Sequence, residues 1–190
     1  AYVDESWIND PVRLIPRLRE WIDQFYPGTR LAIGEWNWGG EDSMSGGLAV
    51  ADVLGIFGRE GVDMANYWTA PPPGSPAALA FALYKHFGDQ AIAATLEASP
   101  DYITAYASCD SATGDVLLVA INKRWDADVA ASIRLEHRSG GVARVFSISS
   151  ADSSIREAAA IPLEQSELDL TLPAASVSLV RVGGAGSTDT

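Results

Sequence analysis

The pattern of apolar residues changes once along this chain of 190 residues, near residue 96, and this change limits the folds open to it. Before it, helical periodicity alternates with short apolar runs. The helices are predicted over 11–26, 48–59 and 76–87, and the strands over 30–34 and 62–68. After it, about six short apolar or alternating runs are separated by turn residues, which is typical of an antiparallel β-sandwich.

The alternating part predicts parallel strands covered by helices, but two strands are too few to bury three helices. We therefore expect residues 1–96 to be the C-terminal part of a TIM-like (β/α)8 catalytic barrel, with strands 7 and 8 and their helices. Residues 97–183 are predicted to be a β-sandwich accessory domain, and 184–190 a disordered tail. The fold class is thus α/β plus all-β. An upstream N-terminal segment of the same protein is expected to complete the barrel.

Composition excludes several kinds of partner. A net charge of −12 repels a phosphate backbone, so nucleic acid is not an expected partner, whereas neutral polysaccharide is indifferent to this charge. No apolar run approaches the roughly 20 residues that a membrane helix needs. The single cysteine, Cys109, forms no disulfide within the chain, which fits the cytosol and equally a secreted bacterial enzyme.

Glu35 is the strongest catalytic candidate, because it directly follows the apolar residues 31–34 of the predicted strand. Reactive groups of parallel α/β barrels lie at the C-terminal ends of strands. Two tryptophans flank Asn37 just beyond, and indole faces beside a carboxylate suit a sugar. The alternative is that Glu35 is a solvated loop acid and that the tryptophans pack in the core. Trp68, which ends the second run, is equally open to both interpretations, and Asn37 could bind a sugar hydroxyl or cap the turn.

The run Glu35-Trp36-Asn37-Trp38-Gly39-Gly40, with the segments 51–63 and 2–8, resembles family 44 of the glycoside hydrolases. This resemblance implies a retaining endo-β-1,4-glucanase or xyloglucanase that acts on β-glucan polysaccharide, with a TIM-like barrel and a β-sandwich. It implies that Glu35 is the nucleophile and that the acid/base glutamate lies on an upstream segment absent here. The chain alone is then expected to be nearly inactive.

The resemblance also implies that tryptophans line a glucan cleft. The substrate-binding candidates are Trp7, Trp36, Trp38 and Trp68, with Asn37. Double displacement requires no cofactor. Structural calcium is possible at the acidic pairs Asp4-Glu5 or Glu41-Asp42, although loop acids usually face water. The implied localisation is extracellular, by secretion.

A non-catalytic carbohydrate-binding or interaction module is the competing interpretation, with the sandwich as its working part. Such a module would place aromatic residues on one exposed sheet face. The sandwich segment offers Tyr102, Tyr106 and Phe146 in strands and Trp125 in a predicted loop. The sequence does not distinguish cellulose, xyloglucan, xylan or a mixed-linkage glucan as the preferred substrate.

Overall fold

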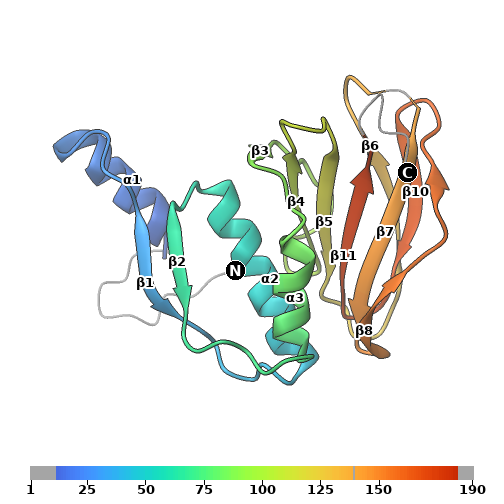
Figure 1. The fold of residues 1–190 in the computed structure, drawn as a ribbon, viewed down its shortest axis with the longest axis horizontal. Coiled ribbons are helices and arrows are strands. Elements are labelled where there is room, and N and C mark those ends of the chain that lie inside the picture. Colours follow the sequence, from blue (N-terminus) through green and yellow to red (C-terminus); the bar gives the residue numbers. More distant parts are fainter. Residues whose placement is uncertain (1–11, 139, 184–190) are drawn as a thin grey trace.

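The structure, a computed structural model, describes residues 12–138 and 140–183 and arranges them in layers (Figure 1). The helices are α1 (Leu14–Phe25), α2 (Met44–Arg59) and α3 (Pro76–Tyr84). The strands of the first half are β1 (Ala32–Trp36), β2 (Met64–Tyr67) and β3 (Gln90–Ile92). Those of the second half are β4 (Ile103–Cys109), β5 (Val116–Asn122), β6 (Val129–Arg134), β7 (Val142–Ser149), β8 (Asp152–Glu157), β9 (Ile161–Pro162), β10 (Glu167–Leu172) and β11 (Ser176–Val182).

Side-chain caps define where α2 and α3 begin. The Ser43 hydroxyl accepts the Gly46 N–H at 3.1 Å, and the Ser75 hydroxyl accepts the Ala78 N–H at 3.2 Å. Each bond satisfies one of the amides that the first turn of a helix leaves unpaired. Ser75 is followed by Pro76 at the first helical position, where the predicted third helix begins.

The strands β1 and β2 pair in parallel, as the alternation of helices and strands predicted. Their register contains one irregularity: Ile33 pairs with Ala65, and Trp36 pairs with Tyr67. Three steps along β1 therefore match two along β2, so Gly34 and Glu35 form a bulge. Among the described residues, each of these strands pairs with the other alone.

A seven-stranded sheet forms the centre of the second half, in the order β3-β4-β5-β11-β7-β8, with β9 also on β7. The helices α2 and α3 cover one face, where Leu117, Val119 and Ile121 of β5 join their core. On the other face, Leu118 and Ala120 of the same strand join a second core. Burial on both faces explains why β5 is a continuous apolar run rather than an alternating one.

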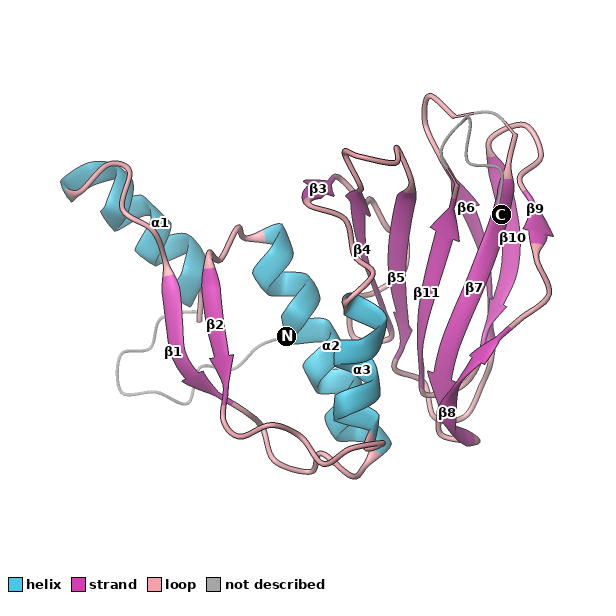
Figure 2. Cartoon of the chain, viewed as in Figure 1, coloured by secondary structure: helices cyan, strands magenta, loops and turns pink. Residues whose placement is uncertain are grey.

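A smaller antiparallel sheet of β6 and β10 contributes the other side of this second core (Figure 2). Leu168, Leu170 and Leu172 of β10 are buried, whereas Asp169 and Thr171 between them are exposed. This alternation is what a strand with one solvated face requires. The predicted antiparallel strands of the second half are thus present as two sheets with a shared apolar layer.

Three strands were not predicted. β3 lies before residue 96, yet it pairs with β4 at the edge of the seven-stranded sheet. β8 begins within the polar segment 149–154, for which the sequence predicts a turn. β9 is two residues long. All three lie at edges or ends, where pairing with a neighbouring strand, rather than apolar periodicity, creates the strand.

Polar contacts also join α2 to the seven-stranded sheet. The Asp52 carboxylate accepts hydrogen bonds from the hydroxyls of Thr104 and Tyr106, both at 2.7 Å. It also pairs with the Lys123 ammonium at 2.7 Å. Three residues further along α2, buried Gly55 lies against the Tyr106 ring. Helix α2 and the sheet are therefore fixed to each other by directional bonds as well as by the apolar core.

Candidate active site at the ends of two parallel strands

Glu35 lies in the β1 bulge, and its side chain is exposed. The bulge is visible in the packing as well as in the register. Ile33 and Trp36 both pack into the core under α2 and α3, although residues three apart in a regular strand face opposite sides. The extra residue is accommodated at Gly34 and Glu35, so the Glu35 side chain is not on the side of β1 that faces the core. Bulges re-aim side chains in this way beside active sites.

The structure corrects the prediction that Trp36 lines a glucan cleft. Its side chain is 8% exposed. Phe57 and Tyr67 lie edge-on to its indole, with ring centroids 5.2 and 4.7 Å away. Such a ring has no free face for a sugar, so Trp36 has the packing role that the alternative interpretation gave it. The bulge is the physical reason, because it returns Trp36 to the core-facing side of β1.

The other predicted residues of this region come together at the C-terminal ends of β1 and β2. Trp38 is 62% exposed and Trp68 58%. The Trp68 N–H donates to the Trp36 carbonyl at 3.0 Å, and the Asn37 side-chain amide donates to the Trp68 carbonyl. Asn37 therefore ties the two strand ends together. This bond crosses between the two strand ends rather than within the turn after β1, and the Asn37 carboxamide oxygen takes no part in it.

Gly39 and Gly40 turn the chain from β1 toward α2, and both have φ near +65°, at +68° and +64°. Left-handed backbone of this kind favours glycine. The Gly40 carbonyl accepts the Ser43 N–H at 2.9 Å. The turn therefore leads directly into the cap of α2 and holds Trp38 at the strand end without covering it.

Sequence reasoning missed one pair beside this site. The Tyr67 hydroxyl donates to the Glu41 carboxylate at 3.0 Å, and the Glu41 carbonyl accepts the Ala77 N–H at 3.2 Å. Burial, and then this bond to Glu41, raise the pKa of Tyr67 to about 12. A separation of 26 residues gives no local signal for such a pair, and only the register of β1 on β2 could have suggested it. Glu41 thus braces the loop after β1.

The raised pKa of Tyr67 predicts a loss of stability at alkaline pH. Burial also raises the pKa of Tyr84 and of Tyr106. An unfolded tyrosine titrates near pH 10. The folded chain therefore holds these protons more tightly, and the free energy of unfolding should fall as pH rises from about 10 toward 12. We expect Tyr67→Phe to make this fall shallower in urea unfolding between about pH 8 and 11.

Tyr26→Phe is the matched control, because the Tyr26 side chain is exposed. Its pH dependence should equal that of the parent. The same steep fall in Tyr67→Phe as in the parent would contradict the prediction.

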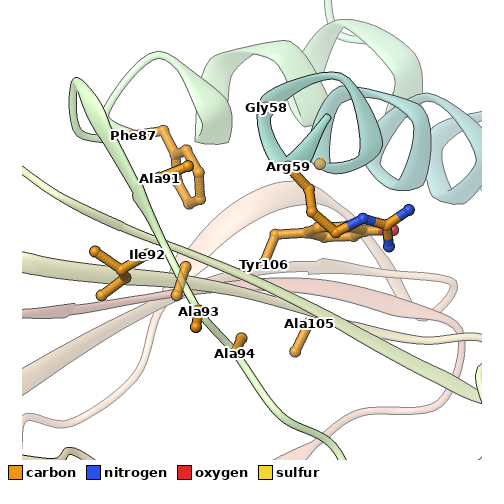
Figure 3. Close-up of a pocket in the computed structure, with 11 residues that line it drawn as sticks. Gly58, Arg59, Phe87, Ala91, Ile92, Ala93, Ala94, Ala105 and Tyr106 are labelled. Atoms are coloured by element: carbon orange, nitrogen blue, oxygen red, sulfur yellow. The ribbon is translucent and has the colours of Figure 1, made fainter. Parts of the chain in front are cut away.

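A cleft of about 390 Å³ lies between α2 and the β3–β4 edge, and Figure 3 shows its lining. The Arg59 guanidinium lies over the Tyr106 ring, 5.9 Å from its centroid. Most of the remaining lining consists of alanine and glycine, with Phe87 and Ile92. The residues that line the cleft include no carboxylate, and it lies toward the C-terminal end of α2, whereas Glu35 lies toward the N-terminal end. It is separate from the candidate site.

Some predictions fall elsewhere. Trp7 and the pair Asp4-Glu5 lie outside the described residues. Within 12–138 and 140–183, no group of three or more His, Cys, Asp or Glu side chains is arranged to hold a metal ion. Calcium at Glu41-Asp42 therefore stays a prediction. In the same part of the chain, no helix has the length and apolar character needed to cross a membrane.

Comparisons with known proteins bear on this site. Endoglucanase A of Paenibacillus lautus is 35% identical over 190 aligned residues, which cover 91% of this chain and 27% of that protein. A bifunctional glucanase-xylanase from a metagenome library is 40% identical with a TM-score of 0.90, over 97% of this chain and 37% of that one. A family 44 xyloglucanase of Paenibacillus polymyxa is 30% identical with a TM-score of 0.82, over 96% and 38%.

No family model matches the chain. The chain spans between about a quarter and two fifths of the length of these relatives. The resemblance predicted from the sequence is confirmed by matches in both sequence and structure. In sequence and in fold, this chain corresponds to the C-terminal part of the family 44 glycoside hydrolases, among which are endoglucanases and xyloglucanases.

Proposed function

We propose that this chain supplies the nucleophile and part of the substrate cleft of a retaining endo-β-1,4-glucanase. The nucleophile is Glu35, and Trp38 and Trp68 are stacking surfaces for β-glucan. The observation that carries the proposal is the exposed carboxylate at the bulge of β1, together with two exposed indoles at the C-terminal ends of β1 and β2. Asn37 joins these strand ends and is a further candidate for binding a sugar hydroxyl.

The remaining barrel comes, in this proposal, from polypeptide that precedes the chain in the whole enzyme. Two features support it. The outer edges of β1 and β2 are unpaired within the described residues, and parallel strands are normally buried among others. In addition, α1 exposes large apolar side chains that its amphipathic pattern would place against protein; these are Leu14, Trp21 and Phe25. Completion of the sheet would cover these strands and this helix face.

The chemistry is a double displacement. The Glu35 carboxylate attacks the anomeric carbon, and the bond from that carbon to the leaving sugar oxygen breaks. A second carboxylic acid, on the upstream polypeptide and roughly 5 Å from the Glu35 carboxylate, gives its proton to that oxygen. Water then loses a proton to the resulting carboxylate and attacks the same carbon, which releases Glu35 and a sugar of retained configuration. No cofactor takes part in these steps.

The names of the relatives support a substrate class; they include endoglucanases, a glucanase-xylanase and a xyloglucanase solved with xyloglucan. We propose a β-1,4-linked glucan backbone, because stacked indoles bind the flat faces of such sugars. A polymer of this kind is met outside the cell, so secretion is part of the proposal. In this proposal the acid/base glutamate lies on the upstream polypeptide, so we expect residues 1–190 alone to be inactive.

The test is covalent labelling of the whole enzyme with a 2-deoxy-2-fluoro-β-cellobioside that carries an activated leaving group. The fluorine slows breakdown of the glycosyl-enzyme, so the ester accumulates. We expect peptide mapping to find the label on Glu35, and Glu35→Gln to remain unlabelled. Glu60→Gln is the matched control, because Glu60 lies at the opposite end of α2 and pairs with Arg59; its labelling should equal that of the parent. A label on any other residue would remove the assignment.

A further inference from the structure

Two aromatic side chains are exposed at one end of the seven-stranded sheet, which the layer of α2 and α3 separates from β1 and β2 (Figure 1). Tyr102 precedes β4 and Trp125 follows β5, and each is 58% exposed. The backbone brings them close, because the Lys123 N–H donates to the Tyr102 carbonyl at 2.8 Å. Single exposed aromatics are common on protein surfaces, but two on adjacent loops at one sheet end form a larger apolar surface.

The loop that carries Trp125 is firmly held. Asn122, which is fully buried, donates through its side-chain amide to the carbonyls of Ala127, Leu172 and Pro173. Its carboxamide oxygen accepts the Arg124 N–H at 3.0 Å, and the Arg124 carbonyl accepts the Ala175 N–H at 2.6 Å. These bonds fix the backbone on both sides of Trp125. A rigid loop presents the indole at little cost in conformational entropy when a ligand binds.

Polar groups flank the two rings. The Arg124 guanidinium forms two hydrogen bonds to the Asp126 carboxylate, at 3.2 and 3.0 Å. Aromatic faces bordered by an arginine and a carboxylate are a suitable surface for sugars, because C–H faces stack on rings while hydroxyls bond to charged groups.

This surface lies toward the same end of the molecule as Glu35. The helix α2 begins just after the loop that carries Trp38 and then meets β4 in order, with Asp52 at Thr104 and Gly55 at Tyr106. The start of β4, where Tyr102 lies, is therefore directed toward the N-terminal end of α2, and the end of β5 lies beside it. Figure 1 shows the loops after β1 and β2 at this lower end as well.

We infer that Tyr102 and Trp125, with Arg124 and Asp126, form a second contact site for β-glucan, outside the cleft at Glu35. The ligand class rests on the proposed function. The site binds a stretch of polymer that extends beyond the catalytic residues, or a neighbouring chain of the same polymer. This second site helps the enzyme to retain long substrates, and it takes no part in the bond-breaking step.

The test uses the whole enzyme in native gels that contain soluble xyloglucan or hydroxyethylcellulose. We expect Tyr102→Ala and Trp125→Ala to be retained about 3- to 10-fold less strongly than the parent, as loss of one ring contact predicts. Trp125→Tyr, which keeps a ring, should recover most of the retention. Turnover of a short cello-oligosaccharide, which fills the cleft alone, should be unchanged in all three variants.

Val142→Ala is the control, because Val142 is an exposed apolar side chain at the opposite end of the same sheet. Its retention should equal that of the parent. Equal retention of Tyr102→Ala, Trp125→Ala and the parent would overturn the second site while leaving the proposed hydrolase intact. A parent that neither cleaves the oligosaccharide nor is retained by either polymer would overturn the proposed function, and with it this ligand class.

Discussion

Glu35→Ala in the whole enzyme is expected to reduce kcat on β-glucan by roughly 10³- to 10⁶-fold, the range seen when a covalent nucleophile is removed. The substitution leaves the fold intact, because the Glu35 side chain is exposed at a bulge and makes no core contact. Reducing-sugar release from soluble β-glucan measures the effect. We expect the variant to unfold at the same temperature as the parent, which would show that the substitution removes the chemistry and not the fold.

Azide distinguishes loss of the nucleophile from loss of a general acid. In Glu35→Ala the space left by the carboxylate admits azide, which attacks the anomeric carbon of an activated aryl β-cellobioside while the phenolate leaves. We expect an α-glycosyl azide, because one displacement inverts the configuration. A β-glycosyl azide would mean that another carboxylate still acts as nucleophile, and Glu35 would then have a different role. Glu60→Ala should show parental activity without azide.

Gly55→Ala is expected to lower the free energy of unfolding by about 1–3 kcal/mol, as overpacking of a filled core does. A Cβ at this position would lie well within 3.0 Å of three ring atoms of Tyr106. The ring cannot move aside cheaply, because its hydroxyl bonds to Asp52 and Arg59 lies over its face. This overlap outweighs the roughly 0.5–1 kcal/mol that alanine gains over glycine in a helix. Each kcal/mol lowers Tm by about 2–4 °C.

Gly58→Ala is the matched control, since Gly58 lies one turn further along α2 and is exposed, and a methyl group added to it would meet no atom within 4 Å. It should raise stability slightly. A double-mutant cycle with Tyr106→Ala isolates the cause: in that background Gly55→Ala should no longer destabilise. An equal cost with and without the Tyr106 ring would show that backbone effects, not this contact, limit the position.

Much of the secondary structure could be predicted because local chemistry determines it. Ser75 followed by a proline indicated where α3 begins, and the continuous apolar run of β5 indicated a strand. Edge strands gave no such signal. β8 begins at Asp152 and carries mostly polar residues, so its strand character comes from pairing with β7 rather than from its own sequence.

The candidate site was predictable in part. A carboxylate directly after an apolar run indicated Glu35, and exposure of Trp38 and Trp68 agrees with that expectation. The bulge could not be predicted, because one extra residue in β1 depends on its register with β2. That single residue reverses the faces after it and buries Trp36. The bond between Tyr67 and Glu41 depends on the same register.

The core beneath α2 and α3 contains residues of β1 and β2 on one side and residues of β4, β5 and β11 on the other. The strand that carries Glu35 therefore rests, through one layer of helices, on the antiparallel sheet. The sheet therefore supports the strand ends through a shared core and is not a separately packed domain. Deleting it would expose the apolar underside of both helices, so enzyme engineers should exchange the helices and the sheet together, as one unit.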